Sequence, residues 1–175
     1  MIFNSVTFLV FLTIVVSAYW LLNPKLKMWM LLLASCIFYG FWRWEFLGVM
    51  FLSAITDYFT ALEIGKTKEH ETKKRKILLA LTLLVNLGML FYFKYLFFIS
   101  ENINEVFHYF HSDIQLPIYK IILPFGISFY TFQTLSYSID VYKRRLEPTY
   151  DFIAFAAFVS FFPQLVAGPI ERATN

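Results

Sequence analysis

The chain has 175 residues, of which 59% are hydrophobic, 21% are aromatic and only 15% are charged, whereas soluble domains are about 45–50% apolar and about 25% charged. A soluble domain of this length buries only about two-thirds of its surface, so its 22 Phe, 11 Tyr and 4 Trp would leave much apolar surface facing water. This composition excludes a soluble enzyme, a disordered segment and a nucleic-acid-binding domain, and the net charge of +3 is too small to indicate a polyanionic partner.

Six hydrophobic runs with few charges predict transmembrane helices, because about 17–25 apolar residues cross the hydrocarbon of a bilayer. The runs are residues 4–22, 26–42, 46–62, 77–99, 117–142 and 152–168. The second run is the weakest, since its uninterrupted core covers only residues 29–42. It spans the membrane if Lys25, Lys27 and Arg43 snorkel to the interfaces, and otherwise it forms a re-entrant hairpin with the third run.

Basic residues orient these runs, because the cytoplasmic loops of membrane proteins are rich in Lys and Arg. Eleven of the 15 Lys and Arg residues lie in the alternate loops 23–27, 63–76 and 143–149. The loop 100–116 carries three acidic residues and no basic one. We therefore expect an all-α, polytopic membrane protein of about six helices, forming a single domain over residues 1–175, with its N-terminus outside and its basic loops in the cytoplasm.

The fifth run combines a predicted helix break with a polar face. Pro124 and Gly126 kink or interrupt the helix. Four polar residues beyond them share one helical face: Gln133, Ser136, Tyr137 and Asp140. Lipid would not tolerate such a face, so it either forms hydrogen bonds with other helices or lines a substrate path.

The sixth run contains a second predicted break, because Pro163, Gly168 and Pro169 forbid a continuous helix. At about 1.5 Å per residue, Pro163 lies roughly 18 Å from the inner end of its span, and Pro124 lies roughly 10 Å below the outer end of its own. Both breaks thus fall in the outer half of the bilayer, where irregular backbone is tolerated only around a cavity or inside protein. We expect a pocket open to the outside, with the polar face of the fifth run continuing inward beneath it.

Asp57 is a candidate functional residue, because an acidic group within a span is costly unless it has a role. It shares a helical face with Ser53 and Thr60 in the third run. Its position about five residues from the cytoplasmic loop makes hydration from that side the simpler interpretation.

Metal-ion and nucleophilic catalysis find little support. Glu105, His108, His111 and Asp113 have a spacing that suits zinc ligands, but an amphipathic turn in the headgroup region explains the same residues. The single cysteine, Cys36, excludes a Cys-rich site and an internal disulfide framework. The chain has no Gly-rich phosphate loop and no complete catalytic constellation, so we expect no metal.

Several segments that occur in a fixed order carry a family resemblance. They are MIFNS (1–5), LASCIFYGFWRWEFL (33–47), DY (57–58), YFKY (92–95), LPFGISFYTFQ (123–133), SYSIDVY (136–142) and FPQLVAGPI (162–170). Through them the chain resembles the membrane-bound O-acyltransferase (MBOAT) family, in its bacterial branch of alginate and peptidoglycan O-acetyltransferases and the teichoic-acid D-alanyl transferase.

The resemblance implies a ring of helices in the bacterial cytoplasmic (inner) membrane that moves an acyl group, usually acetyl. The donor is cytoplasmic, such as acetyl-CoA or an acyl carrier, with no other cofactor bound, and the acceptor is a hydroxyl of an extracytoplasmic polysaccharide. Alginate-like exopolysaccharide, peptidoglycan and secondary cell-wall polymers all remain possible acceptors. The implied partners are membrane lipid, the rest of the MBOAT domain and the machinery of polymer synthesis or export, with no nucleic acid. The residues at motif positions that line the donor or acceptor path are Gln133, Ser136, Tyr137, Asp140, Gln164 and Pro169.

The family's catalytic histidine, the general base, lies in a later intramembrane segment, and none of His70, His108 or His111 is in the matching place. A general base must reach the proton that it removes. We therefore expect the chain to be the N-terminal part of an MBOAT domain, with its catalytic histidine beyond Asn175, and to be inactive alone. The missing base also motivates a non-catalytic membrane assembly partner or a truncated gene product. Broken helices motivate a third hypothesis, a small transporter.

Overall fold

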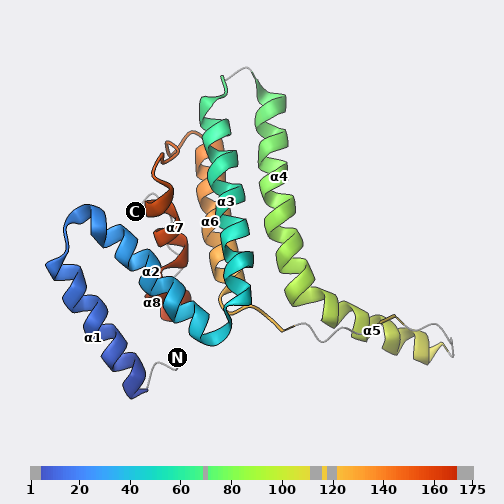
Figure 1. Cartoon of the computed structure of the whole chain (residues 1–175). Coiled ribbons are helices and arrows are strands. Elements are labelled where there is room, and N and C mark those ends of the chain that lie inside the picture. Colours follow the sequence, from blue (N-terminus) through green and yellow to red (C-terminus); the bar gives the residue numbers. More distant parts are fainter. Residues whose placement is uncertain (1–4, 69–70, 111–115, 118–121, 169–175) are drawn as a thin grey trace.

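A computed structural model describes residues 5–68, 71–110, 116–117 and 122–168 (Figure 1). These residues form helices and connecting loops with no strand, which confirms the expected all-α class. The helices are α1 (Val6–Leu21), α2 (Pro24–Arg43), α3 (Glu45–Lys66), α4 (Thr72–Leu90), the π-helical segment Phe91–Tyr95, α5 (Leu96–Tyr109), α6 (Ile127–Tyr142), α7 (Phe152–Ser160) and α8 (Phe162–Ala167).

Two helices of the described part are long and apolar enough to cross a membrane. They are α3, with 22 residues, and the continuous helix Thr72–Tyr109, with 38 residues. The structure therefore supports two of the six expected spans by length and composition, and the six-span arrangement stays a prediction. The second run forms the full 20-residue helix α2, which rises about 30 Å at 1.5 Å per residue.

The centre of the fold is a bundle of α3, α4 and α6, with α7 packed against α2 and α3 (Figure 1). Met50, Ala54 and Ile64 of α3 lie in the same buried cluster as Ile127 and Tyr130 of α6. Small residues such as Ala54 allow close approach between helix backbones where lipid offers no hydrophobic driving force. The α1–α2 hairpin lies to one side, and α5 runs away from the bundle beyond the π-helical segment, which is a common cause of kinks in helices.

Two arginines join the ends of the bundle that carry basic loops. Arg75, in the first turn of α4, donates a hydrogen bond to the carbonyl of Tyr142, and its guanidinium lies 5.0 Å from the centre of the Tyr142 ring. Arg144 donates to the carbonyls of Gly65 and Thr67. The loops 63–76 and 143–149 therefore meet at one end of the bundle, as their charge pattern predicts.

Candidate functional site

The first helix break is the turn that begins α6. Pro124 is buried, and Gly126 adopts a left-handed conformation with φ 71°. The carbonyl of Gly126 accepts hydrogen bonds from the N–H groups of Phe129 (2.8 Å) and Tyr130 (3.0 Å). The described residues before this turn, 116–117 and 122–124, are not helical, so the helix of the fifth run begins only at Ile127, and the interruption of a longer helix at Pro124 and Gly126 stays a prediction.

The second break lies at Phe161, where α7 ends and α8 begins, two residues before Pro163. In a continuous helix the Pro163 ring would clash with the carbonyl four residues earlier, whereas proline is tolerated in the first turn of a new helix. Gly168 ends α8, and its N–H donates to the carbonyl of Gln164 at 3.0 Å. A Cβ atom at Gly168 would lie 2.8 Å from the Gln164 Cα atom, so a larger residue does not fit there. Pro169 lies outside the described residues.

The two breaks are neighbours, and one face of α2 holds both of them. A Cβ atom built on Gly126 would lie 3.4 Å from Cδ2 of Leu165 in α8. The Tyr39 hydroxyl donates to the carbonyl of Phe125 at 2.7 Å. The Ser35 hydroxyl accepts from the N–H of Phe162 at 3.3 Å. Ser35 and Tyr39 are four residues apart, so they point to the same side of α2.

Gln133 completes this junction from α6. In a continuous helix, the N–H of Phe162 would donate to the carbonyl of Phe158. At the break the Phe162 N–H donates to the Ser35 hydroxyl instead. The Phe158 carbonyl accepts a hydrogen bond from the Nε2 atom of Gln133, at 3.1 Å. Nε2 also lies 3.5 Å from the Oε1 atom of Gln164. Side chains of α2 and α6 thus satisfy two of the backbone groups that the break releases, the Phe162 N–H and the Phe158 carbonyl, as buried polar groups require.

The other members of the predicted polar face have different surroundings. The Ser136 hydroxyl donates to the Gln133 carbonyl of its own helix at 2.8 Å. The Tyr137 hydroxyl accepts from the Thr149 N–H at 3.0 Å. Asp140 is 7% exposed, and none of the described residues hydrogen-bonds its carboxylate. Of this face, Gln133 therefore forms the interhelical hydrogen bond that was one of its two expected roles, from α6 to the Phe158 carbonyl of α7.

Asp57 lies in a second polar site, where α3, α4 and α6 meet. Its side chain is fully buried, so the expectation of hydration from the cytoplasmic side is wrong. The Nδ2 atom of Asn86 in α4 lies 2.9 Å from both Asp57 carboxylate oxygens. The Oδ1 atom of Asn86 accepts from the hydroxyls of Ser53 and, at 3.5 Å, Thr134. The periodicity of α3 predicts that Ser53, Asp57 and Thr60 share a face, but it does not reveal which helices cover that face.

Sequence reasoning missed the partners of Asp57. The Thr82 hydroxyl lies 2.6 Å from the Thr60 hydroxyl, and Thr82 precedes Asn86 by one helical turn. The available sequence signal was the pair Thr82 and Asn86, a hydroxyl and an amide four residues apart within the fourth hydrophobic run. On α6 the missed residues form a second polar face, which packs toward α3 and α4 and is fully buried: Thr131, Thr134 and Ser138.

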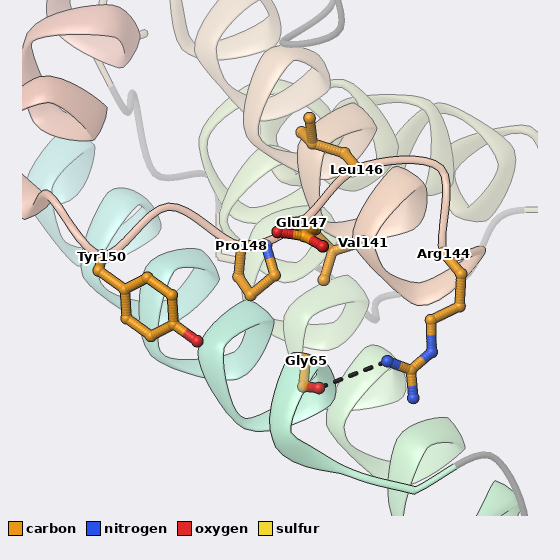
Figure 2. Close-up of a pocket in the computed structure, with 7 residues that line it drawn as sticks. All are labelled: Gly65, Val141, Arg144, Leu146, Glu147, Pro148 and Tyr150. Atoms are coloured by element: carbon orange, nitrogen blue, oxygen red, sulfur yellow. Dashed lines mark hydrogen bonds between the residues drawn. The ribbon is translucent and has the colours of Figure 1, made fainter.

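Two cavities among the described residues lie away from the helix breaks. The pocket open to the outside that the sequence analysis expects at the breaks stays a prediction. One, of about 310 Å³, lies at the end of α6 far from Gly126 and is shown in Figure 2, where the Arg144 side chain reaches the carbonyl of Gly65. Its lining residues are Gly65, Val141, Arg144, Leu146, Glu147, Pro148 and Tyr150. The other lies between α1 and α2.

The described residues contain no group of three or more His, Cys, Asp and Glu side chains that could hold a metal ion. His108 is exposed near the end of α5. His70, His111 and Asp113 lie outside the described residues.

The chain is similar to bacterial O-acetyltransferases over most of its length. It is 39% identical over 173 residues to a protein named probable alginate O-acetylase AlgI from Pseudomonas aeruginosa, and 38% identical over 173 residues to one of the same name from Azotobacter vinelandii. It is 35% identical over 173 residues to a peptidoglycan O-acetyltransferase from Helicobacter pylori.

These matches cover 98%, 98% and 85% of this chain and 33%, 34% and 31% of the relatives, respectively. The chain therefore spans about a third of the length of the curated relatives it matches. No family model and no solved structure matches it. The relatives confirm the resemblance that the motifs indicate: the chain is MBOAT-like and is related to the alginate and peptidoglycan O-acetyltransferases.

Proposed function

We propose that the chain is part of an O-acyltransferase that moves an acetyl group from a cytoplasmic donor to a hydroxyl of an extracytoplasmic polysaccharide. The donor is acetyl-CoA or an acyl carrier. The observation that carries the proposal is the 39% identity, over 98% of the chain, to a protein named alginate O-acetylase. Alginate and peptidoglycan both present sugar hydroxyls, so a polysaccharide hydroxyl is the acceptor class that the names of the relatives share.

The junction of the two helix breaks supports a path for substrate in this part of the protein. The Tyr130 hydroxyl and the Oε1 atom of Gln133 are buried there without a hydrogen-bond partner among the described residues. Buried polar atoms in proteins almost always have partners, so these two oxygens suit hydrogen bonding to a polar substrate. The residues that we propose to line the path remain Gln133, Ser136, Tyr137, Asp140, Gln164 and Pro169.

We also propose the membrane arrangement that such a path needs. Six spans cross the bacterial cytoplasmic membrane, with the N-terminus outside and the basic loops inside. The meeting of loops 63–76 and 143–149 through Arg75 and Arg144 supports a common side for both loops. The proposed partners are membrane lipid, the remainder of an MBOAT domain, the polysaccharide acceptor and the machinery that synthesises or exports it.

Cysteine labelling tests the orientation. In a Cys36→Ala background, Tyr109→Cys is expected to react with a membrane-impermeant maleimide in intact cells, because α5 ends on the proposed outer side. Lys73→Cys is expected to react only after permeabilisation. Both positions are exposed in the structure, so access depends on the side of the membrane. The opposite labelling pattern would invert the whole topology.

A chimera tests the activity. The third of the Pseudomonas aeruginosa relative that aligns with this chain is replaced by the chain, in a strain that lacks its own acetylase. We expect acetyl esters to reappear on the secreted alginate. The 175 residues expressed alone are the control and should give none, because the general base is expected in a later segment. A chimera that reaches the membrane at the level of the intact relative yet leaves alginate unacetylated contradicts the proposal.

A further inference from the structure

The α1–α2 hairpin carries an apolar groove that the proposed acyl transfer does not use. The groove has a volume of about 430 Å³. Its lining residues are all apolar and recur at helical spacing on both helices: Phe11, Ile14, Val15, Ala18, Leu22, Leu26, Trp29, Met30, Leu33, Ala34 and Ile37. Figure 1 shows that α1 and α2 lie at the side of the bundle, so the groove belongs to a peripheral hairpin.

The length of the groove matches one leaflet of a bilayer. Its lining runs along α1 from Phe11 to Leu22, which corresponds to roughly 17 Å at 1.5 Å per residue. The hydrocarbon core of a bilayer is about 30 Å thick, so one leaflet is about half of that. Because Ala18 and Ala34 leave space between the helices, the groove suits a single extended hydrocarbon chain that lies along the hairpin.

One end of the groove is positively charged. Leu22 and Leu26 flank the turn between the helices, and Lys25 and Lys27 lie at that same turn. The ammonium group of Lys27 lies 4.5 Å from the centre of the Tyr19 ring. No acidic residue occurs in the first 44 residues of the chain, and among the described residues neither lysine forms an ion pair. An occupant of the groove therefore meets a cationic site where the turn reaches the membrane interface.

We propose that this groove binds an anionic phospholipid, with one acyl chain along α1 and α2 and its phosphate at Lys25 and Lys27. The proposal rests on the membrane placement proposed above. The apolar lining fits the hydrocarbon, and the two unpaired cations fit a negative headgroup rather than a zwitterionic one. Neither a second copy of this hairpin, which carries the same positive charge, nor a neutral lipid matches the charge at the turn.

Trp29 lines the groove and reports directly on its occupant. The chain is reduced to Trp29 alone by Trp20→Phe, Trp42→Phe and Trp44→Phe, and is reconstituted into vesicles. Phosphatidylglycerol or phosphatidylcholine with brominated acyl chains is added at equal mole fraction, and fluorescence quenching is measured. We expect brominated phosphatidylglycerol to bind with a preference of about fivefold or more, since each lysine near an anionic headgroup favours binding by about that factor.

Two pairs of variants separate the groove from the general lipid surface. Lys25→Gln with Lys27→Gln should remove the preference for phosphatidylglycerol, whereas Lys73→Gln with Lys74→Gln, on α4, should keep it. Ala18→Phe fills the groove and should lower quenching of Trp29 by both lipids. Val16→Phe is the matched control, because Val16 lies on α1 but is 47% exposed and outside the groove.

A second reporter keeps the two proposals distinguishable. In a chain that retains only Trp44, which is 73% exposed, quenching by either brominated lipid reports membrane insertion without the groove. Equal quenching of Trp29 by the two lipids overturns the anionic-lipid site. Quenching of Trp44 but not of Trp29 also overturns it, because the groove is then covered by protein. If neither tryptophan is quenched, the membrane placement itself fails.

Discussion

Replacing Asn86 by Leu is expected to lower the free energy of unfolding by about 3 kcal/mol, at the upper end of the cost of leaving a buried polar group without its partner. Asn86 is fully buried, and its amide is the group that hydrogen-bonds both oxygens of the Asp57 carboxylate. A leucine of similar volume removes these bonds and also the acceptor used by Ser53. The carboxylate stays buried inside the α3–α4–α6 bundle and loses both hydrogen bonds that the Asn86 amide donates.

The measurement is unfolding of the reconstituted chain in increasing dodecyl sulfate, followed by circular dichroism. Asn102→Leu is the matched control, because Asn102 is exposed and, among the described residues, its amide donates only to the Phe98 carbonyl of its own helix, so its cost should stay within about 0.5 kcal/mol. Adding Asp57→Leu to Asn86→Leu should recover part of the loss, since removing both partners of a buried polar pair is far less costly than removing one. Equal stability of Asn86→Leu and Asn102→Leu would contradict this account of the site.

Gly126→Ala is expected to destabilise the chain by about 1–2 kcal/mol, the cost of holding an L-residue in the left-handed region. The φ of 71° at Gly126 carries this strain, because the Cβ atom itself meets only Leu165, at 3.4 Å. The same substitution at Gly88 should have the opposite sign. Gly88 lies within α4, and a Cβ atom there meets nothing within 4 Å, so alanine should stabilise the helix by about 0.5–1 kcal/mol.

Both alanine variants are measured by the same unfolding titration. Because α8 packs on the Gly126 turn, we also expect Gly126→Ala to reduce acetylation by the chimera more than Gly88→Ala does. If both variants shift stability in the same direction, the left-handed turn does not determine where α6 begins.

Local chemistry accounts for where α6 begins. Pro124 and Gly126 precede its first residue, because proline lacks an N–H and glycine readily adopts the left-handed turn. Pro163 breaks the sixth run for the same backbone reason, although the break falls at Phe161 because a proline fits within the first turn of the next helix. The hydrophobic runs and the basic loops likewise follow from composition, and the motifs were enough to indicate the family.

Contacts between segments far apart in the sequence were not predictable in this way. Ser35 and Phe162 are 127 positions apart, and Tyr39 and Phe125 are 86 apart. No periodicity in either segment indicates that one helix face holds both breaks. The burial of Asp57 was likewise not predictable from its own helix. It depends on Asn86 of α4, which contacts Asp57 only in the folded bundle.

Composition, spacing and motifs were enough to predict an apolar, all-helical, MBOAT-like chain with a common sign of charge on alternate loops. These properties depend on residue type and on spacing along one helix, which are local. The folded arrangement of the helices was needed to show that the Gly126 turn adjoins α8, that Gln133 replaces the lost donor at Phe158, and that Asn86 hydrogen-bonds Asp57. Each of these depends on which helix faces which, and the free energy that fixes it comes from packing and buried hydrogen bonds between helices.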